Sequence, residues 1–192
     1  MEEKTVKLSS KLKKAVVLCL VTVMGVMMLQ GCGKKSDEDV LKSMKEFSCE
    51  DGTYSLYLDE AWEVEDLGME NWFSAFNSAG TEGVVVMQFP HDSSIMAMES
   101  MDSMITLVES SYAYEGTDTD APELSALKNL KASEGKITID GSNIDGFVIY
   151  GESDYAYYAF IFAANNIDDS FTQKMNLACS KFVENAPAAT EE

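Results

Sequence analysis

The only histidine of the chain, His91, lies in the run Pro90-His91-Asp92-Ser93-Ser94, which brings a base, an acid and hydroxyl groups close together in the sequence. Hydrolase chemistry would need the base to reach its nucleophile and a third group to orient that base. Adjacency along the chain does not supply this geometry. Asp and Ser are also common capping residues, and a helix is expected to begin here. We therefore interpret Asp92, Ser93 and Ser94 as caps, assign no catalytic residues and expect a protein that is not an enzyme.

Four methionines follow in the pattern Met96-x-Met98-x-x-Met101-x-x-Met104. Thioether clusters of this kind can bind soft Cu(I). On a helix, however, Met98 and Met101 would lie on the apolar face, whereas Met96 and Met104 would lie at its margin. Because the four sulfurs cannot meet one ion from these positions, we interpret the methionines as core filling and assign no metal site.

A third set of chemically capable residues is the acidic run from Glu115 to Glu123, in which Glu115, Asp118, Asp120 and Glu123 offer oxygen ligands. Ca²⁺ prefers such ligands, but the spacing of an EF-hand is missing. The run predicts a solvated loop, with weak Ca²⁺ binding as the alternative. No cofactor is assigned.

The second half of the domain holds more tyrosine than a core needs. Tyrosine combines apolar area with a polar tip, so exposed members would suit an interface. The candidates for such an interface are Tyr112, Tyr114, Tyr155 and Tyr157.

The N-terminus has the order of a signal peptide. Five lysines precede the uncharged apolar run 15–29, which is shorter than the roughly 20 residues that a membrane-spanning helix needs. The run ends in Leu29-Gln30-Gly31-Cys32, which resembles the lipobox of bacterial lipoproteins. That resemblance implies cleavage after residue 31 and a diacylglyceryl group on Cys32, whose two chains would hold the protein stably on the extracytoplasmic face of the cell membrane.

The charge of the chain excludes a class of partner. The formal net charge is −19, and loss of the leader 1–31, with five lysines against Glu2 and Glu3, would leave −22. Nucleic-acid binding depends on cationic side chains that neutralise phosphates, so we exclude a nucleic-acid partner. Attachment to anionic lipid through a basic patch is excluded for the same reason, which leaves the lipid on Cys32 as the contact with the membrane.

Two cysteines remain in the mature chain, Cys49 and Cys179. An even number in an exported protein favours a disulfide, and both residues share a face with apolar neighbours. Two buried free thiols explain the pattern equally well, because the sequence does not fix the distance between them. Both alternatives stay open.

The pattern of the remaining chain predicts one domain at 46–185, after a tether at 32–45 and before a frayed tail at 186–192. Alternating apolar residues and turns predict an antiparallel sheet of about six strands covered by helices, an α+β fold. The strand from Tyr155 to Ala163 is apolar on both faces and is therefore expected at the centre of the sheet. The expected strands are 47–49, 53–58, 72–76, 84–89, 130–139, 144–151 and 155–163, and the helices 94–112 and 168–184.

The segment from Gly52 to Leu58, followed by Trp62, resembles the opening of the PsbP-like and Mog-like family of α/β/α sandwiches. The hairpin residues 137–141, the aromatic strand 155–162 and the closing Ser180-Lys181-Phe182 fall where that family has similar elements, although Asp59 replaces its usual proline. The family includes a photosystem II subunit, Ran-binding proteins and many small bacterial lipoproteins. The resemblance implies binding or assembly work without shared catalytic residues.

These observations leave two functions open. The first is a non-catalytic binding or assembly factor that docks on an envelope protein, and its sign would be an exposed aromatic patch. The alternative is a lipoprotein that binds a small ligand or metal for an envelope transporter or sensor. The sign of the alternative would be a pocket with convergent polar groups.

Overall fold

The computed structural model describes residues 35–69, 71–93, 98–139 and 142–185 of the 192-residue chain. The predicted leader, the lipobox with Cys32, Met96 and the tail 186–192 lie outside these ranges. Within the described residues, no helix is both long enough and apolar enough to cross a lipid bilayer.

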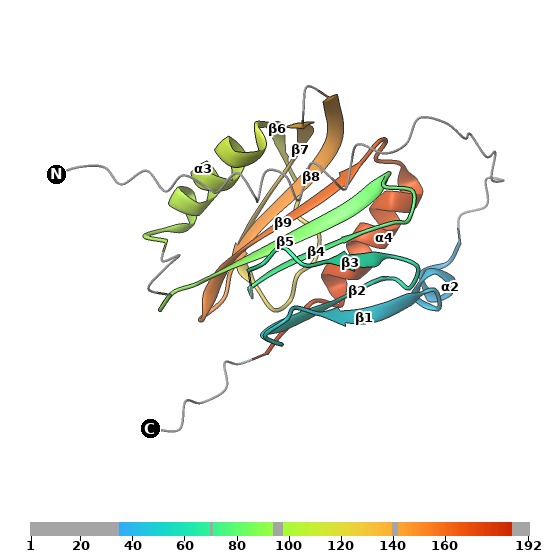
Figure 1. Ribbon diagram of the computed structural model, residues 1–192, viewed down its shortest axis with the longest axis horizontal. Coiled ribbons are helices and arrows are strands. Elements are labelled where there is room, and N and C mark those ends of the chain that lie inside the picture. Colours follow the sequence, from blue (N-terminus) through green and yellow to red (C-terminus); the bar gives the residue numbers. More distant parts are fainter. Residues whose placement is uncertain (1–34, 70, 94–97, 140–141, 186–192) are drawn as a thin grey trace.

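The main sheet has seven antiparallel strands in the order β3-β4-β5-β9-β8-β7-β6. Figure 1 shows it crossing the middle of the molecule, with helices on both sides. The predicted α+β class with an antiparallel sheet is therefore confirmed. The strands are β3 (Glu63–Glu65), β4 (Trp72–Phe76), β5 (Glu82–Pro90), β6 (Tyr114–Thr119), β7 (Lys128–Ile139), β8 (Ser142–Glu152) and β9 (Ala156–Ala164).

Strand β9 is the fourth of the seven strands, as its sequence predicted. It pairs with β5 on one side and β8 on the other. Tyr158, Phe160 and Phe162 point to one face, whereas Ala159 and Ile161 point to the other, and all five are buried. Alternate residues of a strand face opposite sides, so two apolar faces require two covering layers.

One face of β9 is covered by helix α4 (Asp169–Ser180) and a small sheet of three strands. The Asp168 side chain caps α4 by accepting hydrogen bonds from the backbone N–H groups of Ser170 and Phe171. The helix ends four residues earlier than expected, because the chain then forms an additional strand. The small sheet consists of β1 (Met44–Ser48), β2 (Tyr54–Asp59) and β10 (Val183–Glu184), in the order β1-β2-β10.

The other face is covered by helix α3 (Met101–Tyr112). We expected this helix to begin at Ser94 with Asp92 to Ser94 as caps, and that prediction is wrong. Ser100 is the cap, and its side chain accepts from the backbone N–H of Ser103. Met104, Val108 and Tyr112 lie on the buried face of α3, at helical spacing of four.

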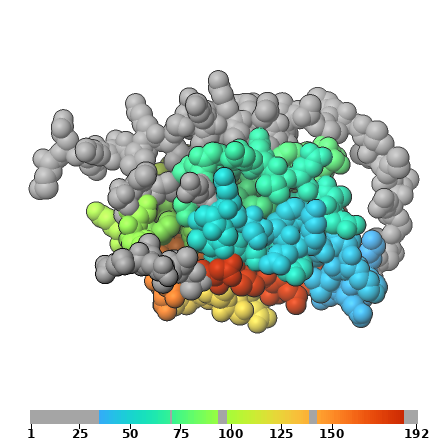
Figure 2. Space-filling model, turned by 60° about the horizontal axis from the view of Figure 1, so that its bottom comes forward, coloured from blue at the N-terminus to red at the C-terminus, as the bar shows by residue number. Residues whose placement is uncertain are grey.

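Part of the segment that we expected to be a tether is folded and packs on the domain. Residues Asp37–Leu41 form the short helix α2, and Val40 is buried in the core. Gln173 of α4 donates hydrogen bonds to the Lys35 carbonyl (2.9 Å) and to Asp37 Oδ1 (2.6 Å). Figure 2 shows the first described residues, in blue, close to the red C-terminal part of the chain. The apolar Val40, Leu41 and Met44 explain why this polar stretch still packs.

Candidate functional site

A pocket of about 370 Å³ lies between α3 and the strands β6, β7 and β8. This volume is near the lower end of the range typical of small-molecule sites, roughly 300–1,000 Å³. It is lined by residues of four elements, which are Asp102, Ile105, Thr106, Glu109, Asp118, Lys131, Ala132, Ser133 and Tyr150.

Helix α3 contributes a polar stripe to this pocket. Asp102, Thr106 and Glu109 stand at positions i, i+4 and i+7, which fall on one side of a helix. By helical periodicity these residues lie away from the apolar face of the helix. They line the pocket together with side chains of β6, β7 and β8.

The sheet contributes two neighbouring rows of side chains. Asp118 of β6 is directly opposite Ser133 of β7, and Lys131 of β7 is directly opposite Tyr150 of β8. Lys131 and Ser133 are two positions apart on one strand, so both rows face the same side. Antiparallel pairing thus brings an acid, a base and two hydroxyls from three strands together.

Three buried hydroxyl groups in this region make no hydrogen bond of ordinary geometry, although Tyr150 lies beside Glu109 and Tyr114 lies beside Ser133. They belong to Ser133, Tyr150 and the adjacent Tyr114, whose residues are 7%, 3% and 9% exposed. Within the described residues, Trp72 Nε1 is the fourth buried side-chain atom in this condition. Leaving a buried polar group unpaired costs about 1–3 kcal/mol, so a better-placed partner for these hydroxyls would stabilise the fold.

The hydroxyl of Tyr114 lies in the space that a Cβ would occupy at Gly116. Glycine at 116 therefore lets the tyrosine ring lie along its own strand. Burial raises the pKa of Tyr114, so this hydroxyl stays protonated near neutral pH.

The charges around the pocket are mostly negative. Asp102, Glu109 and Asp118 face a single cation, Lys131. Lys131 Nζ lies 2.8 Å from Asp102 Oδ1, and both side chains are more than half exposed, so this ion pair is at the surface. Burial raises the pKa of Tyr150, and the neighbouring Glu109 carboxylate raises it further, which keeps Tyr150 a neutral hydroxyl.

The predicted tyrosine interface divides into two pairs. Tyr112 and Tyr114 are buried against α3 and the sheet, so the expectation that they form a surface patch is wrong for these two. Tyr155 is 47% exposed and Tyr157 is partly buried. Tyr112 is the last residue of α3 and lies on its buried face, whereas Tyr114 is the first residue of β6 and packs in the same core cluster.

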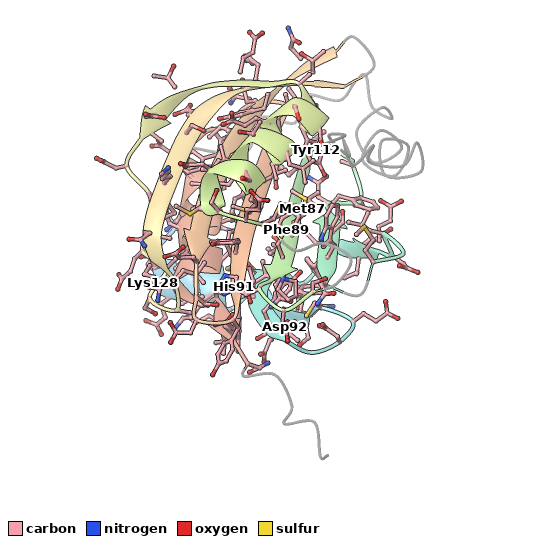
Figure 3. All side chains as sticks on the ribbon, turned by 90° about the vertical axis from the view of Figure 1, so that its left-hand side faces the viewer. Met87, Phe89, His91, Asp92, Tyr112 and Lys128 are labelled. Carbon is pink, nitrogen blue, oxygen red and sulfur yellow. The ribbon has the colours of Figure 1, made fainter. Side chains whose placement is uncertain are left out.

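His91 lies beside the second pair rather than in a catalytic group. Its ring contacts the Tyr157 ring, with centroids 4.6 Å apart. Figure 3 shows His91 and Asp92 at the end of β5, with Lys128 at the same end of the molecule. Lys128 pairs with Asp154 at 2.7 Å and lowers the pKa of that carboxyl.

Cys49 and Cys179 are both buried and both free, so the structure contains two separate thiols instead of the disulfide. The Cys49 thiol donates to Asp51 Oδ1 at 2.9 Å, inside the turn between β1 and β2. Burial and then Asp51 raise the pKa of Cys49, and burial raises that of Cys179. Both thiols are therefore protonated near neutral pH.

The structure also shows where the methionines and the acidic run lie. Met98 and Met101 pack partly buried against the core, as expected, but Met104 is fully buried and does not lie at the margin. The acidic run was expected to be a loop, yet its first half forms the exposed strand β6. Across the described ranges, no three His, Cys, Asp or Glu side chains gather in a way that could hold a metal.

The pocket residues were not recognised from the sequence as a group. The polar stripe of α3 and the lone serine in β7 were visible signals. Their meeting depends on which strands lie beneath the helix, and sequence periodicity does not give that order.

No protein-family model matches the chain, and no curated protein matches it. Among solved structures, a protein from Bacteroides thetaiotaomicron VPI-5482 is similar at 11% identity and a TM-score of 0.49, over 75% of this chain and 49% of its own. The chain thus spans about half the length of that protein. The cyanobacterial PsbP (CyanoP) of Synechocystis sp. PCC 6803 is similar at 12% identity and a TM-score of 0.49, over 82% of this chain and 99% of its own. Neither likeness carries an inference about ligand, partner or activity.

Proposed function

We propose that this protein is a non-catalytic binding lipoprotein, anchored through Cys32 on the extracytoplasmic face of the membrane, which binds a small polar ligand beneath α3. One observation carries the proposal. Polar side chains of four elements line one pocket of ligand size, and the hydroxyls of two of them, Ser133 and Tyr150, make no hydrogen bond of ordinary geometry.

Of the two functions that the sequence left open, the pocket favours the small-ligand alternative. The sign expected for protein docking was an aromatic patch, and half of the predicted tyrosines are buried. The sign expected for a small ligand was a pocket with convergent polar groups, and such a pocket is present. The absence of a gathered metal-ligand set in the described residues argues for an organic ligand.

The place of the anchor supports access to the pocket. Only Gly33, Lys34 and Lys35 separate Cys32 from Ser36, the cap of α2, so the anchor reaches roughly 14 Å at most. In Figure 1, α2 and α3 lie at opposite ends of the long axis. Lipid on Cys32 would therefore hold the α2 end near the membrane and leave the α3 pocket facing outward.

Docking of an envelope protein remains a second candidate function, on the strength of one surface. Tyr155 is 47% exposed and adjoins the ring pair of His91 and Tyr157. Exposed tyrosine is common at protein interfaces. This surface is at the end of the sheet and does not overlap the pocket lining.

One experiment tests both candidates. The native lipoprotein would be purified from its own membranes in mild detergent, and everything retained would be measured by mass spectrometry for the wild type, Tyr150→Phe and Tyr155→Ala. We expect a defined small molecule that is lost with Tyr150→Phe and kept with Tyr155→Ala. A stoichiometric protein with the reverse dependence would establish docking instead, and retention of neither would contradict both.

A further inference from the structure

The pocket beneath α3 has a charge that selects among small polar ligands. Of its four charged side chains, three are carboxylates and one is a lysine. That lysine, Lys131, is already paired with Asp102 at the surface. Within the described chain, neither Glu109 nor Asp118 forms an ion pair with a lysine. Glu109 and Asp118 therefore remain without a cationic partner, and Glu109 lies beside the Tyr150 hydroxyl.

The hydrogen-bonding groups of the pocket lining also favour a cationic ligand. An ionised carboxylate only accepts hydrogen bonds, whereas a hydroxyl can donate or accept. A ligand that satisfies Glu109, Asp118, Ser133 and Tyr150 must therefore bring several N–H or O–H donors. An anion would meet like charge and would leave the carboxylates without donors, which costs free energy in a partly desolvated site.

We infer that the α3 pocket binds a small organic cation, a protonated amine that also carries hydroxyl groups. Its ammonium group pairs with Glu109 and Asp118, and its hydroxyls exchange hydrogen bonds with Tyr150 and Ser133. This ligand class rests on the proposed function, because it specifies what that same pocket takes.

A bare metal ion fits the pocket less well than an organic cation. The carboxylates come from different elements, α3 and β6, and the described residues form no gathered metal-ligand set. Lys131 also lines the pocket, and its ammonium group would repel a divalent ion. A volume of about 370 Å³ far exceeds that of one ion.

Isothermal titration calorimetry on the mature lipoprotein in mild detergent tests the inference. The probes are glucosamine, glucose and glucuronate, which share one sugar ring and differ in charge, together with putrescine as a cation without hydroxyls. We expect glucosamine to bind at least tenfold more tightly than glucose, putrescine to bind more weakly than glucosamine, and glucuronate not to bind. Added salt should weaken the binding of the cations.

Two isosteric variants and a matched control assign the binding to this pocket. Glu109→Gln removes one charge from the lining, and Tyr150→Phe removes one buried hydroxyl. We expect each to weaken glucosamine binding at least tenfold. Glu134→Gln, an exposed neighbour of Ser133 on β7, changes the net charge equally and should leave binding unchanged.

Each other outcome overturns the inference. Equal binding of glucose and glucosamine would show a pocket for neutral polyols and would leave the proposed small-ligand function standing. Tighter binding of glucuronate than of glucosamine would show that the pocket prefers an anionic ligand. Absence of heat with both cations would reject the cation class, and the proposed function would then depend on whether Tyr150→Phe loses a co-purifying molecule of another charge.

Discussion

The hydroxyl of Tyr158 donates a 2.7 Å hydrogen bond to Oε1 of Glu184, which joins the central strand of the main sheet to the last strand of the small sheet. The same hydroxyl accepts a 2.6 Å hydrogen bond from Nε2 of Gln88 on β5. Ser153 donates to the same Glu184 oxygen at 2.6 Å. These four polar side chains connect the two sheets through an otherwise apolar layer.

The first prediction concerns this network. Tyr158→Phe keeps the ring but leaves Gln88 and Glu184 each without one partner, so we expect the free energy of unfolding to fall by about 1–3 kcal/mol. Urea denaturation measures the change. Tyr155→Phe, at an exposed position, is the control and should change it by less than about 0.5 kcal/mol. Equal effects of the two variants would mean that the network does not stabilise the fold.

The second prediction concerns alkaline pH. Burial raises the pKa of Tyr54, Tyr112 and Tyr158 in the folded state. Unfolded tyrosine loses its proton above about pH 10, so above that pH the unfolded state binds fewer protons than the folded state. Stability from these groups is therefore fully present below about pH 10 and decreases above it. The slope is about 1.4 kcal/mol per pH unit for each tyrosine.

Urea denaturation at about pH 8, 10 and 11 tests this dependence. Tyr112→Phe preserves the buried ring but removes one titrating group, so its slope above about pH 10 should be shallower by one proton. If the free energy of unfolding falls with pH equally steeply in this variant and in the wild type, Tyr112 has the same pKa in the folded and unfolded states.

The third prediction concerns the thiols. Cys49 and Cys179 are 4% and 2% exposed, and their raised pKa values disfavour the reactive thiolate. We expect an alkylating reagent to label neither in the native protein and both after denaturation, without added reductant. Mass spectrometry of the peptides counts the labels. A requirement for reductant would show that the two cysteines are joined.

The fourth prediction concerns the anchor. Cys32→Ala removes the residue that the lipobox resemblance assigns to lipidation, so the domain should appear in the medium or as an uncleaved precursor. Cell fractionation with mass spectrometry of the N-terminus measures this. Cys19→Ala lies in the predicted leader and should leave anchoring unchanged. A lipid-bearing membrane fraction in the Cys32→Ala variant would contradict the assignment.

Much of the fold could be predicted because its signals are local. Strand β9 is apolar on both faces, which identified it as central, and α4 begins after Asp168, a residue type that favours helix N-caps. The start of α3 was misplaced, because Asp92 to Ser94 and Ser100 are all suitable caps. The C-terminal strand β10 is only two residues long, too short to show a period.

The sequence by itself determined the acidic net charge and the alternating pattern that makes an antiparallel sheet with apolar faces. Only the tertiary structure decided which tyrosines are buried and which residues meet beneath α3. Tyr150 and Glu109 are 41 positions apart in the chain, and Tyr158 and Glu184 are 26 apart. Contacts over such separations depend on strand order and register, which arise from packing of the whole sheet and leave no local period in the sequence.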